Sequence, residues 1–181
     1  DTVLMRLCDV MLSFPAILVA LLIAGVGRAL FPNANESLAF GVLIISISLT
    51  GWVQYARTVR GTTLVERNKE YVQAARVTGV SSGRIMLRHV LPNVLGPVMV
   101  LATLQVATAI LIEATLSFLG LGTQPPTPSW GELLRQGTQN LNAPWIVISA
   151  FGALVTVLIL VTFVGEAVRE AFDPKRFTVY Q

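Results

Sequence analysis

Few side chains in this sequence could carry out chemistry. One histidine, His89, and one cysteine, Cys8, are present, too few for a disulfide or a Cys/His zinc site. No nucleophile stands with a histidine in a catalytic arrangement. The phosphate-binding pattern G-x-x-x-x-G-K-[ST] does not occur. We therefore expect no catalytic residue, no metal ion and no cofactor bound by this chain.

Glu113 is the acidic residue closest to the middle of a long apolar stretch, because it directly follows the uncharged residues 90–112. Ionisable groups at membrane depth are costly and often functional. Glu113 could line a transport pathway and attract an amino group or a metal cation. It could instead be a buried carboxylate that bonds Ser117, one helical turn further on, or a neighbouring helix. The sequence leaves both interpretations open.

The composition indicates which elements must position these residues. Hydrophobic residues make up 54% of the 181 residues and charged residues 13%, whereas soluble domains have about 45–50% and about 25%. So apolar a chain is not disordered, and its net charge of +3 lacks the basic face that would suit nucleic acid. The composition predicts a membrane protein.

Four stretches reach the roughly 20 apolar residues that a spanning helix needs. We expect crossings at about residues 10–28, 37–56, 92–118 and 145–166. Residues 57–91 and 119–144 would connect them, since neither has an apolar run that could span. The expected fold is all-α, a polytopic membrane helix bundle that forms a single domain over residues 1–181.

Basic residues predict the orientation. Eleven of the thirteen Lys and Arg residues lie in segment 57–91 or near the chain ends, and only Arg28 and Arg135 lie on the other side. The positive-inside rule therefore places both ends and segment 57–91 in the cytoplasm. Residues 119–144 become an outer loop. Its stretch 120–131, rich in glycine and proline, is either a rigid connector, which we favour, or a surface for an external partner.

Segment 57–91 is predicted to contain two helices joined by a tight turn. Residues 66–78 are good helix formers, and Gly79 suits the left-handed conformation that follows a helix end. Ser81 or Ser82 can cap a second helix. Small alanines before the turn would let another surface approach, and arginines surround it. Anionic lipid headgroups or a docking protein would both fit this pattern.

Three separated motifs resemble a known family. Gln73-Ala74-Ala75, Gly79 and Leu91-Pro92 have the spacing of the cytoplasmic signature of permeases in binding-protein-dependent ABC importers. Residues 113–131 (E-A-T-L-S-F-L-G-L-G-T-Q-P-P-T-P-S-W-G) and 9–15 (D-x-x-L-S-F-P) resemble the dipeptide, oligopeptide and nickel branch. The similarity covers nearly the whole chain and points to the C-type subunit of the permease pair.

The resemblance implies a fold of the type I ABC importer permease kind, with about six crossings in the full-length protein. Because this chain starts at Asp1 without a methionine, the first two crossings are expected upstream. The implied function is to form half of a pathway that imports dipeptides or oligopeptides, with nickel as another substrate. The implied partners are a second homologous permease, two ATP-binding subunits that hydrolyse ATP, and an extracytoplasmic substrate-binding protein. The implied location is a bacterial or archaeal plasma membrane.

The same resemblance assigns ATPase coupling to the helix–turn–helix. The residues implied are Tyr71, Gln73, Ala74, Ala75, Arg76, Gly79, Ser81, Arg84, Arg88, His89, Leu91 and Pro92. Two of them depart from the family pattern, because Gln73 stands where Glu is commonest and His89 where Ile is expected. We interpret Gln73 as a tolerated surface substitution. For His89 we favour a packing role at the membrane junction over a pH sensor.

A channel or secondary carrier without an ATPase is the alternative function. Such proteins use several intramembrane ionisable residues or broken-helix sites, and this sequence offers little beyond Glu113 and has no internal repeat. A membrane enzyme has no candidate site. The charged residues Glu166, Arg169 and Glu170 are expected to form a solvated helix end with local pairing.

Overall fold

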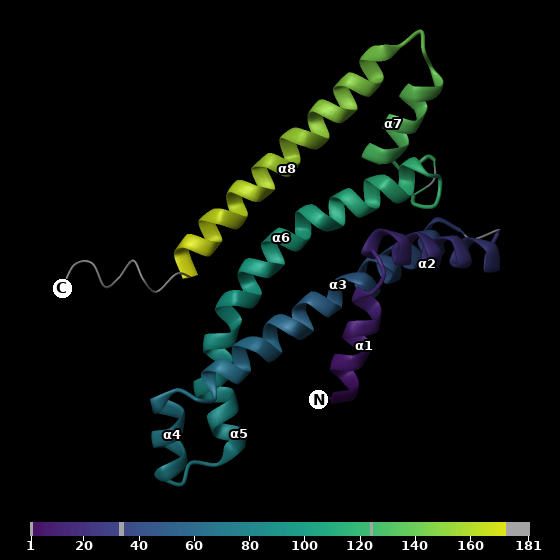
Figure 1. The fold of residues 1–181 in the computed structure, drawn as a ribbon. Coiled ribbons are helices and arrows are strands. Elements are labelled where there is room, and N and C mark those ends of the chain that lie inside the picture. Colours follow the sequence, from purple (N-terminus) through teal and green to yellow (C-terminus); the bar gives the residue numbers. More distant parts are fainter. Residues whose placement is uncertain (1, 33–34, 124, 173–181) are drawn as a thin grey trace.

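The structure is a computed structural model that describes residues 2–32, 35–123 and 125–172. Regular structure in this part of the chain is entirely helical, so the prediction of an all-α helix bundle is confirmed. Lys175 and Arg176, which the orientation prediction used, lie outside the described residues. The elements in chain order are α1 (Thr2–Leu12), α2 (Ala16–Leu30), α3 (Glu36–Glu66), α4 (Glu70–Val77), α5 (Ser82–Ile85), η1 (Met86–Val90), α6 (Leu91–Phe118), α7 (Trp130–Gln139) and α8 (Pro144–Phe172) (Figure 1).

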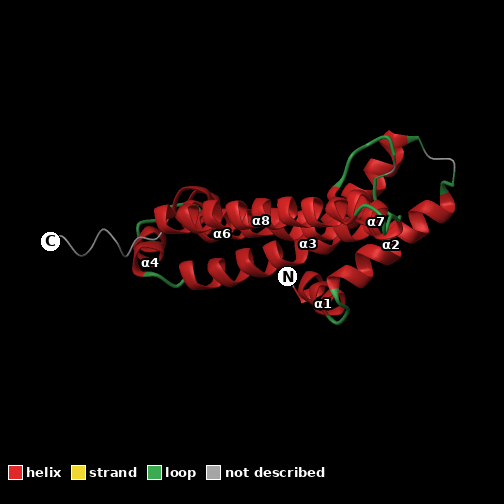
Figure 2. Ribbon diagram, turned by 90° about the horizontal axis from the view of Figure 1, so that it is seen from above, coloured by secondary structure: helices red, strands yellow, loops and turns green. Residues whose placement is uncertain are grey.

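The molecule is elongated, with α3, α6 and α8 running along its length. The short helices α4 and α5 lie at one end and α7 lies toward the other (Figure 1), and the second view places α4 and α7 in the same way (Figure 2). Helix α6 is central, because it packs against α2, α3, α7 and α8. Small residues allow some of these contacts to be close. A Cβ atom added to Gly165 of α8 would lie 3.1 Å from the hydroxyl of Thr103 on α6.

The first predicted crossing, residues 10–28, falls on two helices. α1 ends at Leu12 and α2 begins at Ala16, and the two helices are bent by 89° relative to each other. Pro15 accounts for the break, because proline cannot continue a helix and it disfavours the helical conformation in the residue before it. An ion pair of 2.5 Å between Asp9 and Arg57 ties α1 to α3.

Helix α3 is unbroken over 31 residues, which makes it about 46 Å long. It begins where the side chain of Asn35 accepts a hydrogen bond from the backbone of Leu38, a typical N-cap. Because a bilayer core is about 30 Å thick, α3 is longer than one crossing requires. The predicted crossing 37–56 covers its first two thirds, and the last third extends to α4 as part of segment 57–91.

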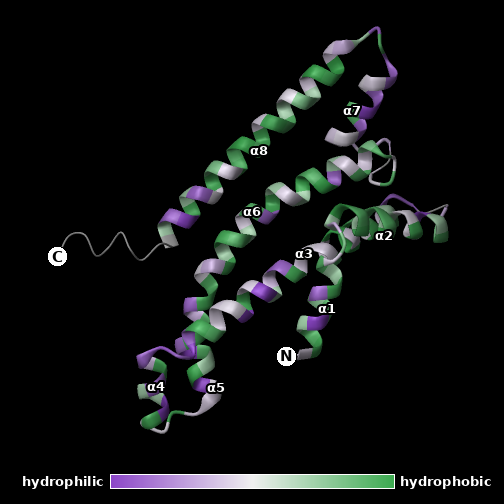
Figure 3. Ribbon diagram, in the orientation of Figure 1, coloured by the Kyte–Doolittle hydropathy of each residue, from purple (hydrophilic) through white to green (hydrophobic). Residues whose placement is uncertain are grey.

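Three helices of the described chain are long and apolar enough to cross a membrane. They are α3, the continuous helix 82–118 formed by α5, η1 and α6, and α8; the bent pair α1 and α2 passes the same test together. Hydrophobic residues dominate α2, α6 and α8, whereas hydrophilic residues gather around α4 (Figure 3). At the end of α8, Arg169 lies 3.6 Å from Glu166, which is the local pairing expected there.

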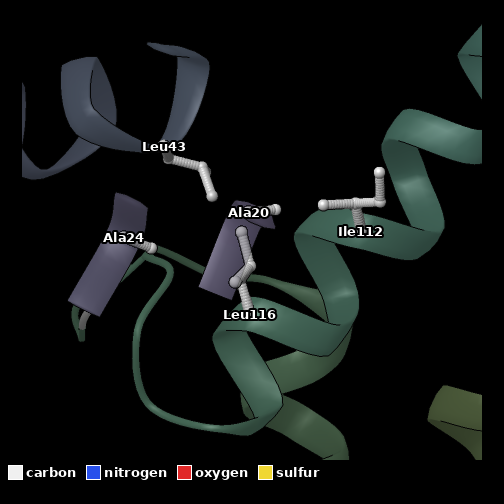
Figure 4. Close-up of a cluster of buried hydrophobic side chains, with 5 residues drawn as sticks. All are labelled: Ala20, Ala24, Leu43, Ile112 and Leu116. Atoms are coloured by element: carbon white, nitrogen blue, oxygen red, sulfur yellow. The ribbon is translucent and has the colours of Figure 1, made fainter. Parts of the chain in front are cut away.

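One apolar cluster holds three helices together. Ala20 and Ala24 of α2, Leu43 of α3, and Ile112 and Leu116 of α6 are buried and point toward one another (Figure 4). The two alanines let the backbone of α2 approach its neighbours closely, which is how membrane helices gain packing energy. This cluster fixes α2 and α3 against the end of α6 that carries Glu113.

Candidate functional site

The predicted helix–turn–helix is present between α3 and α6. Gly79 follows the end of α4 with φ of 79°, so the left-handed position predicted for this glycine is confirmed. Its amide donates to the carbonyl of Arg76, and the amide of Val80 donates to that of Ala75. This pair of bonds is the Schellman motif, which satisfies the last carbonyls of a helix. Ser81 occupies the N-cap position of α5, but its side chain makes no capping bond.

The hairpin formed by α4, α5 and η1, hereafter the α4–η1 hairpin, has its own apolar core. Val72 and Ala75 of α4 pack with Ile85, Val90 and Val94. All five are buried. The hairpin is therefore held in one shape by burial of apolar surface. Of the two alanines predicted to admit another surface, Ala75 instead lies within this core, and only Ala74 is exposed.

The outward face of the α4–η1 hairpin is uncovered. Val77 is 89% exposed at the end of α4, and Leu87 of η1 is 68% exposed. Exposed apolar surface with a polar rim can mark an interaction site when it is contiguous. The exposed neighbours are Ala74, Arg76, Gly79, Arg84 and Arg88. The hairpin thus offers a small apolar surface surrounded by positive charge.

The hydroxyl of Tyr71 joins four segments at the base of this hairpin. It donates to the carboxylate of Glu66 at the end of α3. It also accepts a 3.1 Å hydrogen bond from the Asn93 side chain on α6, which donates a second bond, of 2.7 Å, to the carbonyl of His89. Lys69 lies 2.5 Å from Glu66 and balances its charge. Burial and the negatively charged carboxylate raise the pKa of Tyr71 to about 12, so the hydroxyl remains protonated.

The two departures from the family signature have local structural explanations. The Gln73 side chain donates a 3.3 Å hydrogen bond to the carbonyl of Arg67, a role that a glutamate could not fill because it lacks a donor. His89 stacks its ring on that of Tyr71, with centroids 6.4 Å apart. Its Nδ1 atom is buried without a hydrogen-bond partner in the described chain, and the packing role of His89 stays a prediction.

Sequence reasoning missed two residues of this site, Glu66 and Asn93. Both flank the signature and were not assigned a role. They could have been found from one signal, the presence of a carboxylate and an amide at the two ends of the helix–turn–helix. Leu91 and Pro92 lie between His89 and Asn93, at the start of α6. Pro92 occupies the first turn of that helix, where no backbone donor is needed.

At the opposite end of α6, Glu113 takes part in a compact polar cluster. The Ser117 hydroxyl donates a 2.7 Å bond to Oε1 of Glu113, which was one of the two interpretations of this residue. The same hydroxyl accepts a 3.1 Å bond from the backbone of Thr123. This cluster fastens the loop after α6 to the helix. Glu113 also borders a largely apolar cavity of about 640 Å³, lined by α3, α6 and residues 127–133, so its contact with a pathway stays a prediction.

Helix α7 lies inside the predicted outer loop 119–144. Ser129 caps it by accepting a 3.1 Å bond from the backbone of Glu132. Glu132 is buried and receives two 2.7 Å hydrogen bonds from Arg135, which hold its pKa below the ordinary value. Gly131 faces the backbone of α6, and Gly137 faces that of α8. Helix α7 is therefore packed against two long helices, α6 and α8.

Long apolar helices, a polar hairpin at one end and a packed amphipathic helix at the other define a polytopic membrane protein. Residues 1–178 match the family described as "Binding-protein-dependent transport system inner membrane component". The chain belongs to this family. It is thus a multi-pass membrane component of a transport system, as the resemblance predicted.

Similar curated proteins are peptide permeases. The oligopeptide transport system permease protein OppC of Salmonella typhimurium is 43% identical over 176 residues, which cover 97% of this chain and 55% of that protein. OppC of Haemophilus influenzae is 42% identical, with coverages of 97% and 54%. The glutathione transport system permease protein GsiD of Shigella flexneri is 35% identical, with coverages of 97% and 55%. The chain thus spans about half the length of these relatives.

A solved structure has the same fold. A chain of the inward-facing MetNI methionine ABC transporter superposes with a TM-score of 0.72, covering 93% of this chain and 73% of that chain. The sequence identity is 17%, so the likeness concerns the fold. The prediction that this fold is of the ABC importer permease kind is confirmed.

Proposed function

We propose that this chain is part of a permease subunit of an ATP-driven importer of oligopeptides or dipeptides, with nickel as another candidate substrate. The names of the similar permeases support peptides as the substrate class. The chain would form half of the translocation pathway, and a second homologous permease would form the other half. A substrate-binding protein outside the membrane would deliver the peptide.

The α4–η1 hairpin is proposed to dock on an ATP-binding subunit. The observation that carries this proposal is its outward face, where Val77 stands 89% exposed among arginines while the hairpin core is closed. A preformed apolar surface with a charged rim has the anatomy of a protein interface. ATP would be bound and hydrolysed by two such partner subunits. The chain ends that carry basic residues and the hairpin would face the cytoplasm.

A pair of matched substitutions tests the docking in the full-length transporter reconstituted in vesicles. Val77→Asp places a charge on the hairpin face, and Leu141→Asp places one on a side chain that is 87% exposed at the outer end. We expect Val77→Asp to release the ATP-binding subunits during purification and to abolish import of a labelled tripeptide. Leu141→Asp should leave the ATP-binding subunits attached. ATP-binding subunits that remain attached and coupled in Val77→Asp would contradict the proposal.

Inactivation of the partner ATPase distinguishes the alternative, a channel or secondary carrier. Peptide uptake should stop when the ATP-binding subunits carry a substitution that blocks hydrolysis. Uptake that continues at the normal rate would support the carrier instead. A competition experiment with Ni²⁺ and a tripeptide, added with the purified binding protein, then decides between the two candidate substrates.

A further inference from the structure

We infer that Tyr71 is the positioning residue that makes the α4–η1 hairpin move as one body with α3 and α6. This inference rests on the proposed docking of the hairpin, and it concerns how motion passes from the docked surface to the crossings. Tyr71 stands on α4, directly beside the face that would dock, and its hydroxyl reaches both helices that enter the membrane.

The contacts of the hydroxyl connect elements that are distant in sequence. Glu66 is the last residue of α3, and Asn93 lies in the first turn of α6, 22 residues after Tyr71. The chain between these residues is the hairpin itself. Without the hydroxyl, α4 would be joined to α3 by a short backbone connection with the exposed Gln73–Arg67 hydrogen bond, and to α6 by apolar packing. Apolar packing is not directional, whereas two hydrogen bonds to one atom fix the geometry of α4.

Tyrosine is suited to this place because its hydroxyl donates and accepts at the same time. The donated bond goes to the charged Glu66, which is 6% exposed, and such charge-assisted bonds are about twice as strong as neutral ones. The accepted bond comes from Asn93. Phenylalanine would preserve the ring and its stacking on His89 but would remove both bonds. The hydroxyl can therefore be tested separately from the packing of the ring.

The helix that receives this connection has an irregular turn. η1 is a five-residue π-helix that immediately precedes α6, and its closing bond runs from the amide of Leu91 to the carbonyl of Met86. Single π turns inside helices are rare and are frequently found at functional sites. Because Asn93 binds both Tyr71 and the carbonyl of His89 inside η1, the network bridges this turn. Without this network, a displacement of the hairpin would bend η1 and would not be passed on to α6.

The test compares Tyr71→Phe with Tyr55→Phe, the same substitution on α3 outside this network, in the full-length transporter with its partner subunits. The measured quantity is the number of ATP molecules hydrolysed per peptide imported. A hydrogen bond to a charged partner biases an equilibrium by roughly tenfold. We therefore expect Tyr71→Phe to raise the ratio by about that factor, with ATP-binding subunits still attached, and Tyr55→Phe to leave it unchanged. Glu66→Gln, which keeps an acceptor, should give a smaller rise.

Each other outcome counts against the inference. An unchanged ratio in Tyr71→Phe would show that the hydroxyl carries no motion. Loss of the ATP-binding subunits would show that Tyr71 serves only the shape of the docking surface. If the Tyr71→Phe permease does not fold, Asn93→Leu removes the other half of the network instead. An unchanged ratio of ATP hydrolysed to peptide imported in Asn93→Leu overturns the inference. The proposed function fails separately, through Val77→Asp.

Discussion

Alanine at position 131 should weaken the contact between α7 and α6. A Cβ atom on Gly131 would overlap the carbonyl oxygen of Ala114 and lie 2.7 Å from the backbone nitrogen of Phe118. These atoms belong to the backbone of α6, which cannot rotate away as a side chain could. Helix α7 would have to move outward, and such overpacking costs about 1–3 kcal/mol. The substitution also gains up to about 1 kcal/mol of helix propensity, so we expect a net loss of up to roughly 2 kcal/mol.

Gly152 of α8 provides the matched control, because a Cβ atom there would meet nothing within 4 Å. Gly152→Ala should therefore show only the propensity gain of up to about 1 kcal/mol. The two variants are compared by thermal unfolding of the purified protein in detergent, where about 1 kcal/mol shifts the midpoint by roughly 2–4 °C for a chain of this length. The midpoint should fall for Gly131→Ala and stay or rise for Gly152→Ala. Equal shifts in the same direction would refute the reasoning from close packing.

Three other substitutions probe separate contacts. Ser117→Ala removes the acceptor for the Thr123 amide, and should lower stability by about 1–3 kcal/mol in the same unfolding assay. Gln73→Glu loses one exposed donor, and should cost less than about 1 kcal/mol while copurification with the ATP-binding subunits persists. Hydrogen bonds from Arg135 keep the pKa of Glu132 below 4.5, so this stabilisation is present above pH 4.5 and is lost as the pH falls through the lowered pKa. Glu132→Gln should therefore flatten the acid-induced fall in the unfolding midpoint.

Local features of the chain could be predicted from the sequence. The left-handed Gly79 between two helices follows from residue types alone. The bond between Ser117 and Glu113, which are one helical turn apart, is one of the two interpretations that the sequence leaves open. Each depends on residues within five positions of one another. The long apolar helices were likewise predicted, because hydropathy over about 20 residues reflects the thickness of the bilayer core.

Helix α7 was missed although its signal was present. Ser129 followed three residues later by Glu132 is the pattern of a capping box. The proline- and glycine-rich stretch before it is typical of a connecting loop, and no helix was predicted there. That stretch is indeed not helical over residues 120–129, in the part that the structure describes. A capping pattern therefore indicates a helix even within a segment whose composition is typical of a connecting loop.

The network around Tyr71 could not be predicted from spacing. Its bonds join residues 5 and 22 positions apart, across a turn whose geometry depends on Gly79 and on the packing of Val72 against Ile85. The sharp bend between α1 and α2 is a similar case. Proline in a membrane helix is compatible with a slight kink or a complete break, and the angle of 89° depends on how both helices pack against the rest of the bundle.

The unbroken course of α3 has a mechanical consequence. An unbroken helix neither shortens nor bends easily, so a displacement of one end of α3 is passed on to the other end. Gly51, midway along α3, has its carbonyl 3.5 Å from the Gln105 side chain of α6. A tilt of the rigid helix about this contact would move its two ends by similar distances in opposite directions. A displacement of Glu66 would thus be accompanied by an opposite displacement of Asn35.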